Sequence, residues 1–213
     1  HLVGFGSPCT VVSTGTWVIC FGVGAKPQRL DPSRDTLVNV DANGQAVPSA
    51  RFMGGREWDL LTRDMAVVPI KEELIAATAV IDAGSMILPS VVMGTGPFPD
   101  SHFRWMNETS SVSERLAAAS LYQALMTQTC LDLIEAEGPI IVEGPFAANQ
   151  LYLRALHTLM KRPVHASEAT TGTAIGAASL TGITIDVKMR SIVDTLDGLD
   201  DYAREWRSRA GKT

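Results

Sequence analysis

The sequence has few of the residues that build metal and disulfide sites. Its 213 residues include three cysteines, Cys9, Cys20 and Cys130, and four scattered histidines. None of them shows the close Cys-x-x-Cys or His-x-x-x-His spacing that is typical of zinc sites. An odd and sparse set of cysteines also argues against a disulfide framework. We therefore expect three small buried thiols, a reducing compartment and hence a cytoplasmic location.

The chain also lacks an excess of positive charge. Lys and Arg number 18 and Asp and Glu number 23, so the formal net charge is −5. Nucleic-acid binding and attachment to an anionic membrane surface both need a basic face. The composition therefore excludes these two classes of partner. With 46% hydrophobic and 19% charged residues, the chain is typical of a globular protein of one large domain or two small ones.

The longest run without a charged side chain covers residues 2–25. It is long enough to span a bilayer, but several glycines and Pro8 interrupt it and no basic segment precedes it. We interpret it as buried β-structure and expect neither a membrane span nor a secretion signal. Because the chain opens at His1 directly on this run, we expect it to be a piece of a longer protein.

The first 50 residues predict antiparallel strands. Two β-prone runs flank Ser13-Thr14-Gly15-Thr16, and two more, at 37–41 and 45–47, flank Asn43-Gly44. Both arrangements are typical of hairpins. Two short helices are expected next, at 57–65 and 71–80. A long loop, with one short strand near residues 86–88, is expected over 86–111, and loops of this length are usually functional or insertions.

The second half predicts alternating helices and strands. A capping box at Ser111-Val112-Ser113-Glu114 indicates the start of a helix that is apolar nearly all round. The expected elements are a helix from 111 to about 137, a strand at 140–142, a helix ending at 161–162, a strand at 164–165, and helices at 168–181 and 191–209. This order predicts an α/β domain with one mixed sheet, in which an antiparallel meander is followed by αβα units, with helices on both faces.

Several common catalytic motifs are absent. The sequence contains no G-x-x-x-x-G-K-[ST], no G-x-G-x-x-G and no G-x-S-x-G. A P-loop, a Rossmann dinucleotide site and a serine-hydrolase elbow therefore have no support.

Three short segments are suited to close approach by a ligand. The glycine turn at 13–16 lets backbone N–H groups approach an anion, and its threonines add hydroxyl donors. The end of the strand at 142–145 opens onto a helix, where ligands of α/β sheets bind, and Asn149 in its first turn is able to bond a base or sugar edge. Residues 168–178 are dense in small side chains. The alternatives are a plain hairpin turn, a plain strand–helix turn and close helix packing.

Taken in order, Ser13-Thr14-Gly15-Thr16-Trp17, Gly54-Gly55-Arg56-Glu57-Trp58 and the block 139–182 resemble the C-terminal domain of FGGY-family carbohydrate kinases. The resemblance covers nearly the whole chain, and the Gly-Thr-Trp ending is most similar to the fuculokinase and rhamnulokinase branch. It implies an actin-like ATPase (ribonuclease H-like) fold. Residues 1–213 would form a single ATP-binding domain, whose partner, the N-terminal sugar-binding kinase domain, is absent from this chain.

The resemblance also implies a site and a reaction. The γ-phosphoryl group of ATP, with Mg²⁺ bridging the phosphates, would pass to a hydroxyl of a small ketose or deoxyketose. The turn at Thr14-Gly15-Thr16 would face the phosphates. The residues expected to bind the nucleotide are Thr14, Gly15, Thr16, Gly144, Pro145, Phe146, Asn149 and Gly172.

Two features depart from the family pattern. Where the family has a run of glycines, this chain has Gly144-Pro145-Phe146; Pro145 removes an N–H group, and Phe146 either stacks on the base or blocks it. The family's catalytic aspartate precedes the turn, whereas the first aspartate here is Asp31. We expect that residue upstream of His1, so the chain alone would bind ATP weakly and be inactive.

Three alternatives stay open at this point. The chain is either half of a kinase, a non-catalytic binding or regulatory module derived from one, or an unrelated α/β domain. A homodimer formed through the face that would meet the missing domain also stays open.

Overall fold

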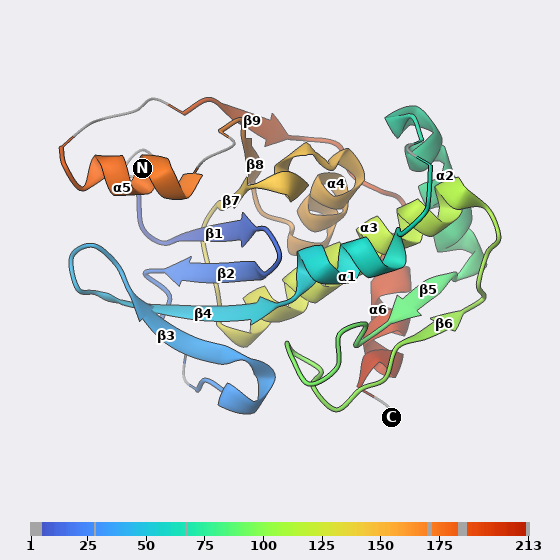
Figure 1. The fold of residues 1–213 in the computed structure, drawn as a ribbon, viewed down its shortest axis with the longest axis horizontal. Helices are drawn as coiled ribbons and strands as arrows, with labels where there is room; N and C mark the ends of the chain where they lie inside the picture. The colour runs from blue at the N-terminus through green and yellow to red at the C-terminus, as the bar shows by residue number, and fades with distance from the viewer. Residues whose placement is uncertain (1–5, 28, 67, 170–171, 183–186, 212–213) are drawn as a thin grey trace.

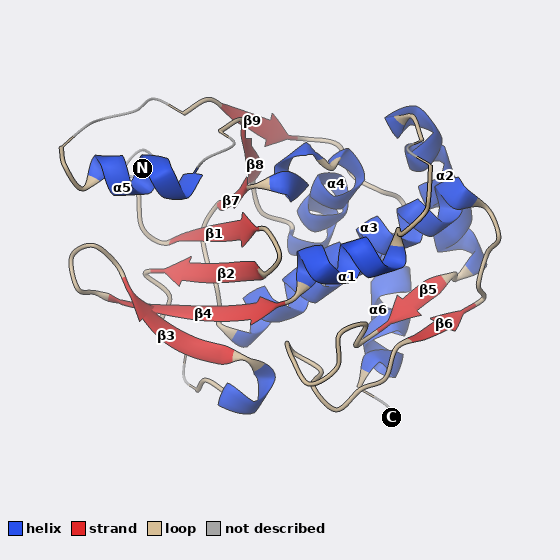
Figure 2. Cartoon of the chain, in the orientation of Figure 1, coloured by secondary structure: helices blue, strands red, loops and turns tan. Residues whose placement is uncertain are grey.

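A seven-stranded mixed sheet runs through the computed structural model, which describes residues 6–27, 29–66, 68–169, 172–182 and 187–211 (Figures 1 and 2). The strands lie in the order β3-β4-β2-β1-β7-β8-β9. Their bounds are β1 Cys9–Thr14, β2 Val18–Val23, β3 Thr36–Val40, β4 Ala46–Phe52, β7 Ile140–Glu143, β8 Val164–Ser167 and β9 Met189–Ile192. A separate two-stranded sheet pairs β5 (Met86–Leu88) with β6 (Arg104–Met106).

The antiparallel half of the sheet follows the predicted hairpins. β1 pairs with β2 across the turn at 15–17, and β3 pairs with β4 across the Asn43-Gly44 turn. The spatial order adds one detail, because β4 and not β3 lies next to β2. Val12, Cys20 and Ala50 lie in register on one face and are fully buried. The contacts of β2 and β4 with α3 (Val112–Leu133) on this face explain why burial alternates along β2.

The parallel half extends the sheet from β1. β7 runs parallel to β1 and to β8, as its unbroken apolar sequence predicts. β9 was not predicted: residues 189–192 pair antiparallel with β8, where the sequence pattern indicated a helix from 191. The side chain of Arg190 on this strand donates to the Gln150 Oε1 atom and the Ala147 carbonyl. These long-range contacts favour an extended segment that the local pattern does not show.

The six α-helices among the described residues match the six predicted helices and differ from them at their ends. Their bounds are α1 Gly54–Leu61, α2 Ile70–Ala83, α3 Val112–Leu133, α4 Gln150–Met160, α5 Gly172–Ser179 and α6 Leu199–Ala210, with single 3₁₀ turns η1 at Pro32–Arg34 and η2 at Pro145–Ala148. α3 ends four residues before the predicted position because Glu135 takes a left-handed φ of 47°. Its capping serine, Ser111, accepts from the backbone N–H of Glu114 at 3.5 Å.

Helix α6 packs against the β5 segment. The Trp206 indole donates to the Ile87 carbonyl and the Tyr202 hydroxyl donates to the Ser85 carbonyl, each at 2.7 Å. Both aromatic side chains are buried. The small β5–β6 sheet is therefore held in place by the polar ends of two buried aromatic residues.

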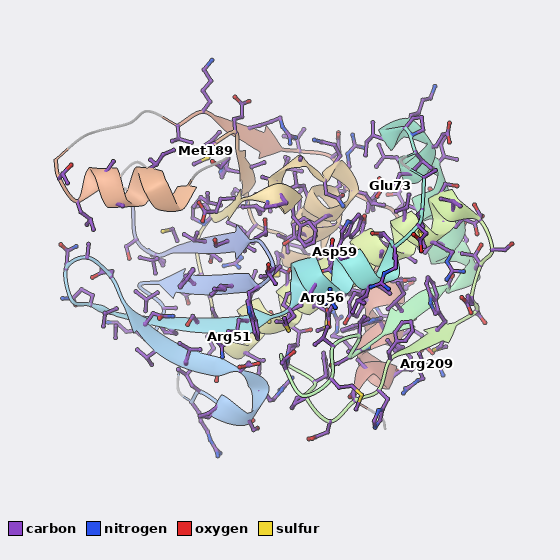
Figure 3. The ribbon with its side chains drawn as sticks, viewed as in Figure 1. Arg51, Arg56, Asp59, Glu73, Met189 and Arg209 are labelled. Atoms are coloured by element: carbon purple, nitrogen blue, oxygen red, sulfur yellow. The ribbon has the colours of Figure 1, made fainter. Side chains whose placement is uncertain are left out.

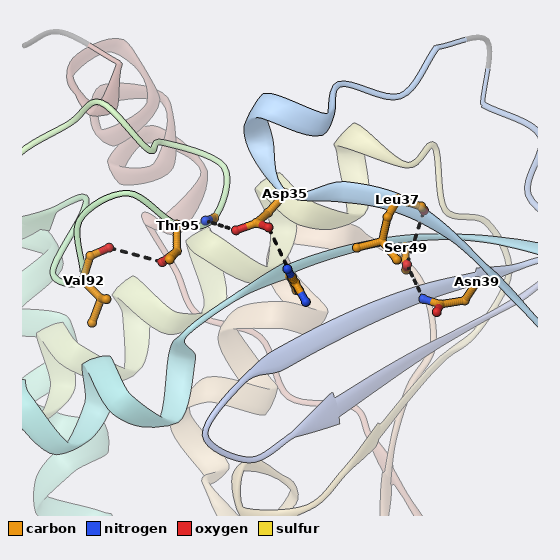
Figure 4. Close-up of polar contacts among 8 residues, drawn as sticks. Asp35, Leu37, Asn39, Ser49, Val92 and Thr95 are labelled. Carbon is orange, nitrogen blue, oxygen red and sulfur yellow. Dashed lines mark hydrogen bonds and ion pairs between the residues drawn. The ribbon is translucent and has the colours of Figure 1, made fainter.

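The loop between β5 and β6 is fixed by polar contacts with the sheet edge (Figure 4). The Asp35 carboxylate accepts from the backbone N–H of Gly96 at 2.7 Å and from the Arg51 guanidinium at 3.2 Å. Arg34 donates to the Pro97 carbonyl at 2.8 Å. The predicted long loop thus packs against β4 and η1. Among the described residues, the structure contains no helix long and apolar enough to cross a membrane.

Candidate functional site

A pocket of 590 Å³ lies where the β1–β2 turn, α1, the start of α2 and η2 meet. The predicted residues Thr14, Gly15, Thr16, Pro145, Phe146 and Asn149 all line it. Segments more than 120 positions apart in the sequence therefore form one wall. Figure 3 shows Asp59 on α1 and Glu73 on α2, two residues that also line this pocket.

Two glycines let the segments of this wall approach each other. A Cβ atom at Gly55 would lie 2.1 Å from the Gly15 carbonyl oxygen, and one at Gly144 would lie 2.0 Å from the Thr14 carbonyl oxygen. Gly144 also has φ 82° and ψ −163°, a conformation that is essentially restricted to glycine. The backbones of α1 and of the segment after β7 are thereby packed directly against the β1–β2 turn.

The hydroxyl of Thr14 is used within the protein. It donates to the Glu143 carbonyl at 2.5 Å and accepts from the backbone N–H of Phe146 at 3.0 Å. The side chain thus joins the end of β1 to the end of β7 and has no proton left for a phosphate. Thr14 supports the wall of the pocket rather than supplying the predicted hydroxyl donor.

Gly15 and Thr16 form the exposed part of the turn. The Gly15 N–H donates to the Trp17 carbonyl at 2.9 Å, and the Thr16 carbonyl accepts from the Arg56 N–H at 3.3 Å. In the described part of the chain, the Thr16 hydroxyl has no hydrogen-bond partner. Of the two predicted hydroxyl donors, Thr16 is therefore the one that remains available to a ligand.

The segment from Gly144 to Asn149 offers few backbone donors to a ligand. Pro145 has no N–H group, and the N–H of Phe146 bonds Thr14. The N–H groups of Ala147 and Asn149 bond the carbonyls of Gly144 and Phe146 within η2. This segment therefore contributes shape and apolar surface to the pocket.

The ring of Phe146 is buried within the floor of the pocket. It packs edge-on against Trp58, with ring centroids 5.7 Å apart, and in a tilted arrangement against Tyr152, with centroids 5.2 Å apart. Only 6% of the residue is exposed. The side chain therefore fills the space beneath the pocket and does not obstruct its opening.

The sequence predicted Asn149 in the first turn of a helix. In the structure it is the N-cap of α4, one position before the helix begins. Its Oδ1 atom accepts from the Tyr152 N–H at 2.9 Å, and its Nδ2 group donates to the Ser120 hydroxyl at 2.9 Å. Ser120 in turn donates to the Glu73 Oε1 atom at 2.7 Å. A continuous chain of hydrogen bonds thus links α4, α3 and α2 along one side of the pocket.

The charge of the pocket is negative. Asp59 and Glu73 line it, and no lysine, arginine or histidine does so among the residues that the structure describes. Burial raises the pKa of the Glu73 carboxyl above its ordinary value, and the hydrogen bond from Ser120 opposes this to a smaller extent.

Helix α1 also carries a buried carboxyl group. Glu57 is almost fully buried; it accepts from the Val92 N–H at 3.2 Å and from the Tyr122 hydroxyl at 3.1 Å. Burial is the largest cause that raises its pKa to about 7. Glu57 therefore connects α1, which forms the pocket wall, to the loop after β5 and to α3.

Gly144 borders a second hollow of 450 Å³ on the far side of η2. Pro145 and Ala148 line both hollows, and Glu168 and Ala169 line only the second. The small-residue block thus begins beside this second hollow. Gly172 begins α5, but its surroundings lie outside the described part of the chain, so its predicted role is untested.

Sequence reasoning missed part of the pocket. The loop between α1 and α2 and the residues Gly55, Trp58, Asp59 and Glu73 line it, and no role was predicted for them beyond the resemblance of the Gly54–Trp58 motif. The sequence signal that could have revealed this part of the pocket is the Gly54-Gly55 pair at the start of α1, because paired glycines allow close approach of another backbone. In the described residues, no group of three or more His, Cys, Asp or Glu side chains is placed to hold a metal ion.

The chain is similar to known kinases. Residues 6–189 match the sequence profile of the family described as Carbohydrate kinase FGGY, C-terminal domain. A carbohydrate kinase from Novosphingobium aromaticivorans is similar in structure, with a TM-score of 0.86 and 38% sequence identity over 96% of this chain and 46% of that one. No curated protein matches the chain.

More distant structures share the fold. A xylulose kinase from Rhodospirillum rubrum has a TM-score of 0.74 and 16% identity over 96% of this chain and 47% of that one. The glycerol kinase of Plasmodium falciparum, whose structure was determined with ADP, has a TM-score of 0.59 and 14% identity over 93% of this chain and 41% of that one. The chain therefore spans less than half the length of these solved kinases.

Proposed function

Because this chain belongs to the FGGY carbohydrate kinase family, whose C-terminal domain it matches, and has the actin-like ATPase fold of its structural relatives, we propose that it is the ATP-binding half of a sugar kinase. Residues 1–213 form one C-terminal domain, and an N-terminal domain supplies most of the sugar site. The substrate is a small ketose or deoxyketose. The fuculokinase and rhamnulokinase branch stays a prediction, as does a cytoplasmic location.

The observation that carries this proposal is the meeting of three separate motifs at one pocket. The turn at Gly15 and Thr16, the α1 segment at Gly55 and the η2 segment at Pro145 line the same hollow. Two direct backbone contacts, Gly55 on Gly15 and Gly144 on Thr14, exclude any larger residue. Glycines and unusual backbone conformations cost free energy of folding. Their presence at these contacts therefore supports a role for the relative positions of the three backbones in binding.

The residues of the pocket fit a magnesium nucleotide. The half-buried side chain of Trp58, which packs on the buried ring of Phe146, offers an apolar surface for a base, and the exposed Thr16 hydroxyl offers a donor to a phosphate. The pocket itself provides no cation among its described residues, so Mg²⁺ would enter with the phosphates, whose negative charge it would neutralise. Thr16 and the turn around it would hold that end of the nucleotide.

The proposed reaction is an in-line displacement at the γ-phosphorus. A sugar hydroxyl oxygen forms a bond to phosphorus, the bond from phosphorus to the β,γ-bridging oxygen breaks, and the hydroxyl proton passes to a carboxylate of the N-terminal domain. Phosphoryl transfer depends largely on positioning and charge stabilisation, and holding two reactants together contributes up to about 7–11 kcal/mol. In this chain, Gly15, Thr16 and Gly55 fix the nucleotide end of that alignment.

A coupled assay of ADP release tests this assignment. The 213-residue chain alone and a protein that also carries the N-terminal domain are each offered Mg-ATP and a panel of ketoses and deoxyketoses. We expect sugar-dependent ADP release from the two-domain protein and none from the chain alone. Sugar-dependent release by the isolated chain would contradict the proposed division of roles.

A second candidate function is a non-catalytic module derived from a kinase. It is favoured by one observation: the N–H groups of Phe146, Ala147 and Asn149 are all bonded within the protein, and Pro145 has none. Titration of the two-domain protein with Mg-ATP separates the candidates. Binding that weakens in Thr16→Val supports the kinase, whereas absence of binding supports the module.

A further inference from the structure

One charged group of the pocket has no part in the proposed phosphoryl transfer. Of the two carboxylates that line it, Asp59 is exposed, whereas Glu73 is partly buried and hydrogen-bonded. Partly buried carboxylates without a cation nearby are unfavourable unless donors surround them. Glu73 therefore needs an explanation that Asp59 does not.

The hydrogen bonds that reach Glu73 all run in one direction. The Tyr152 N–H donates to Asn149, the Asn149 amide donates to Ser120, and the Ser120 hydroxyl donates to Glu73. Because Ser120 accepts one bond and gives its single proton to the next, its donor role toward Glu73 is fixed. The chain therefore orients the carboxylate and presents it as an acceptor.

Only one oxygen of Glu73 is occupied by this chain. The Oε1 atom accepts from Ser120 at 2.7 Å, and among the described residues the Oε2 atom has no hydrogen-bond partner. An ionised carboxylate accepts hydrogen bonds and cannot donate them. Its remaining oxygen is therefore suited to a ligand group that carries a proton, such as a hydroxyl or an amine.

Glu73 lies on the side of the pocket that a nucleoside would reach. α1 begins against the β1–β2 turn, where Gly55 meets Gly15, and its eight residues span about 12 Å. The loop after α1 and the first turn of α2, which carries Glu73, then line the pocket. Figure 3 shows Asp59 on α1 and Glu73 on α2. A triphosphate held at the turn, with its ribose and base extended along α1, would bring the nucleoside to Glu73.

We propose that Glu73 selects the nucleoside of the bound nucleotide by accepting a hydrogen bond from one of its donor groups, either a ribose hydroxyl or the 6-amino group of adenine. The inference rests on the proposed function, because it assumes that a nucleoside triphosphate occupies the pocket. Burial, which already raises the pKa of this carboxyl, strengthens a hydrogen bond made there relative to one made in water.

Calorimetric titration of the 213-residue chain tests the proposal. The probes are the magnesium complexes of ATP, 2′-deoxyATP, 3′-deoxyATP and inosine triphosphate, which lacks the 6-amino group. Loss of a hydrogen bond to a charged group weakens binding by about 10-fold or more. We expect such a loss for a deoxynucleotide if the donor is a ribose hydroxyl, and for inosine triphosphate if it is the amine.

The variant Glu73→Gln tests the assignment to this residue. Its amide oxygen is able to accept from Ser120, which turns an N–H group toward the ligand in place of an acceptor. We expect weaker ATP binding by about 10-fold or more and loss of the difference between ATP and the affected analogue. Glu72→Gln is the matched control, because Glu72 is an exposed neighbour on the same turn of α2 and should bind ATP as the parent chain does.

The outcomes distinguish failure of the proposed function from failure of the role proposed for Glu73. If the parent chain binds no nucleotide, the titrations are repeated with the two-domain protein; absence of binding there means that the proposed function fails and that the selection by Glu73 fails with it. If the parent binds ATP and all three analogues equally, the proposed function stands and the inference is overturned, whatever the variant does. An unchanged preference in a folded Glu73→Gln protein, judged by its melting temperature, also overturns it.

Discussion

The carbonyl oxygen of Gly15 occupies the position next to Gly55 that a side chain would need: a Cβ atom at residue 55 would lie 2.1 Å away from it. The turn between two strands and the first turn of α1 are thus in direct backbone contact. Since both residues line the pocket, the contact is part of the pocket wall.

Gly55→Ala should separate α1 from the turn. Relief of the overlap requires a backbone shift, which typically costs about 1–3 kcal/mol, and the shift should also weaken Mg-ATP binding. Urea unfolding and calorimetric titration measure the two effects. Gly176→Ala is the control, because this helical glycine has open space around its Cβ position and should gain up to about 1 kcal/mol from helix propensity. Equal effects of the two substitutions would contradict the role of the contact.

Gly144→Ala should destabilise the fold more than a glycine substitution that introduces only backbone strain. At Gly144 a positive φ of 82° combines with a Cβ position 2.0 Å from the Thr14 carbonyl oxygen. At Gly44, φ is 75° and nothing lies within 4 Å. Gly44→Ala should therefore cost about 1–2 kcal/mol, and Gly144→Ala at least about 1 kcal/mol more. Chemical denaturation of both variants measures the difference, and similar midpoints would refute it.

The two threonines of the turn should respond differently to valine. Thr14→Val removes a hydroxyl that bonds Glu143 and Phe146, and the unsatisfied groups it leaves should cost about 2–4 kcal/mol of stability. Thr16→Val should change stability by less than about 0.5 kcal/mol and weaken Mg-ATP binding. Thermal unfolding and titration of both proteins test this contrast.

Thr14→Ser serves as the control for that comparison, because it keeps the hydroxyl and loses only a methyl group. Its stability should lie closer to that of the parent chain than to that of Thr14→Val. A Thr14→Val protein as stable as the parent would mean that the link between β1 and β7 contributes little.

Glu57 should make stability depend on pH. Its pKa is raised to about 7 in the folded protein, so the folded state holds this proton more tightly than the unfolded chain does. The stabilisation is present in full below about pH 4.5 and is lost as the pH rises to about 7, with a total change of roughly 3 kcal/mol. Denaturation at a series of pH values measures the trend.

Glu57→Gln should remove that trend, because the amide has no proton to lose in this range. The difference in free energy of unfolding between variant and parent should therefore grow in favour of the variant from pH 5 to pH 8. Parallel profiles for the two proteins would show that Glu57 ionises in the folded state as it does in the unfolded one. Glu72→Gln, at an exposed position, should follow the parent.

Local patterns were sufficient to predict the fold class, most of the strands and helices, and several residues that line the pocket. Asn43-Gly44 and the capping serine at 111 specify their turns through nearby atoms, and β7 shows its burial in its composition. β9 and the partners of Thr14 and Glu73 depend on contacts between residues far apart in the sequence. Such contacts leave no periodic signal in the sequence. The Thr14 hydroxyl, which was expected to face phosphate, therefore could not be recognised as the link between the ends of β1 and β7.

The bonds from Tyr202 and Trp206 to the strand at 86–88 have a consequence for synthesis. They join positions 117 and 119 apart, and a ribosome adds about 5–20 residues per second. The strand therefore waits roughly 6–24 seconds in the nascent chain before Tyr202 and Trp206 are added. Met86, Ile87 and Leu88, all nearly inaccessible in the folded domain, lack the cover of α6 during that interval, and apolar segments left exposed in this way are prone to aggregate.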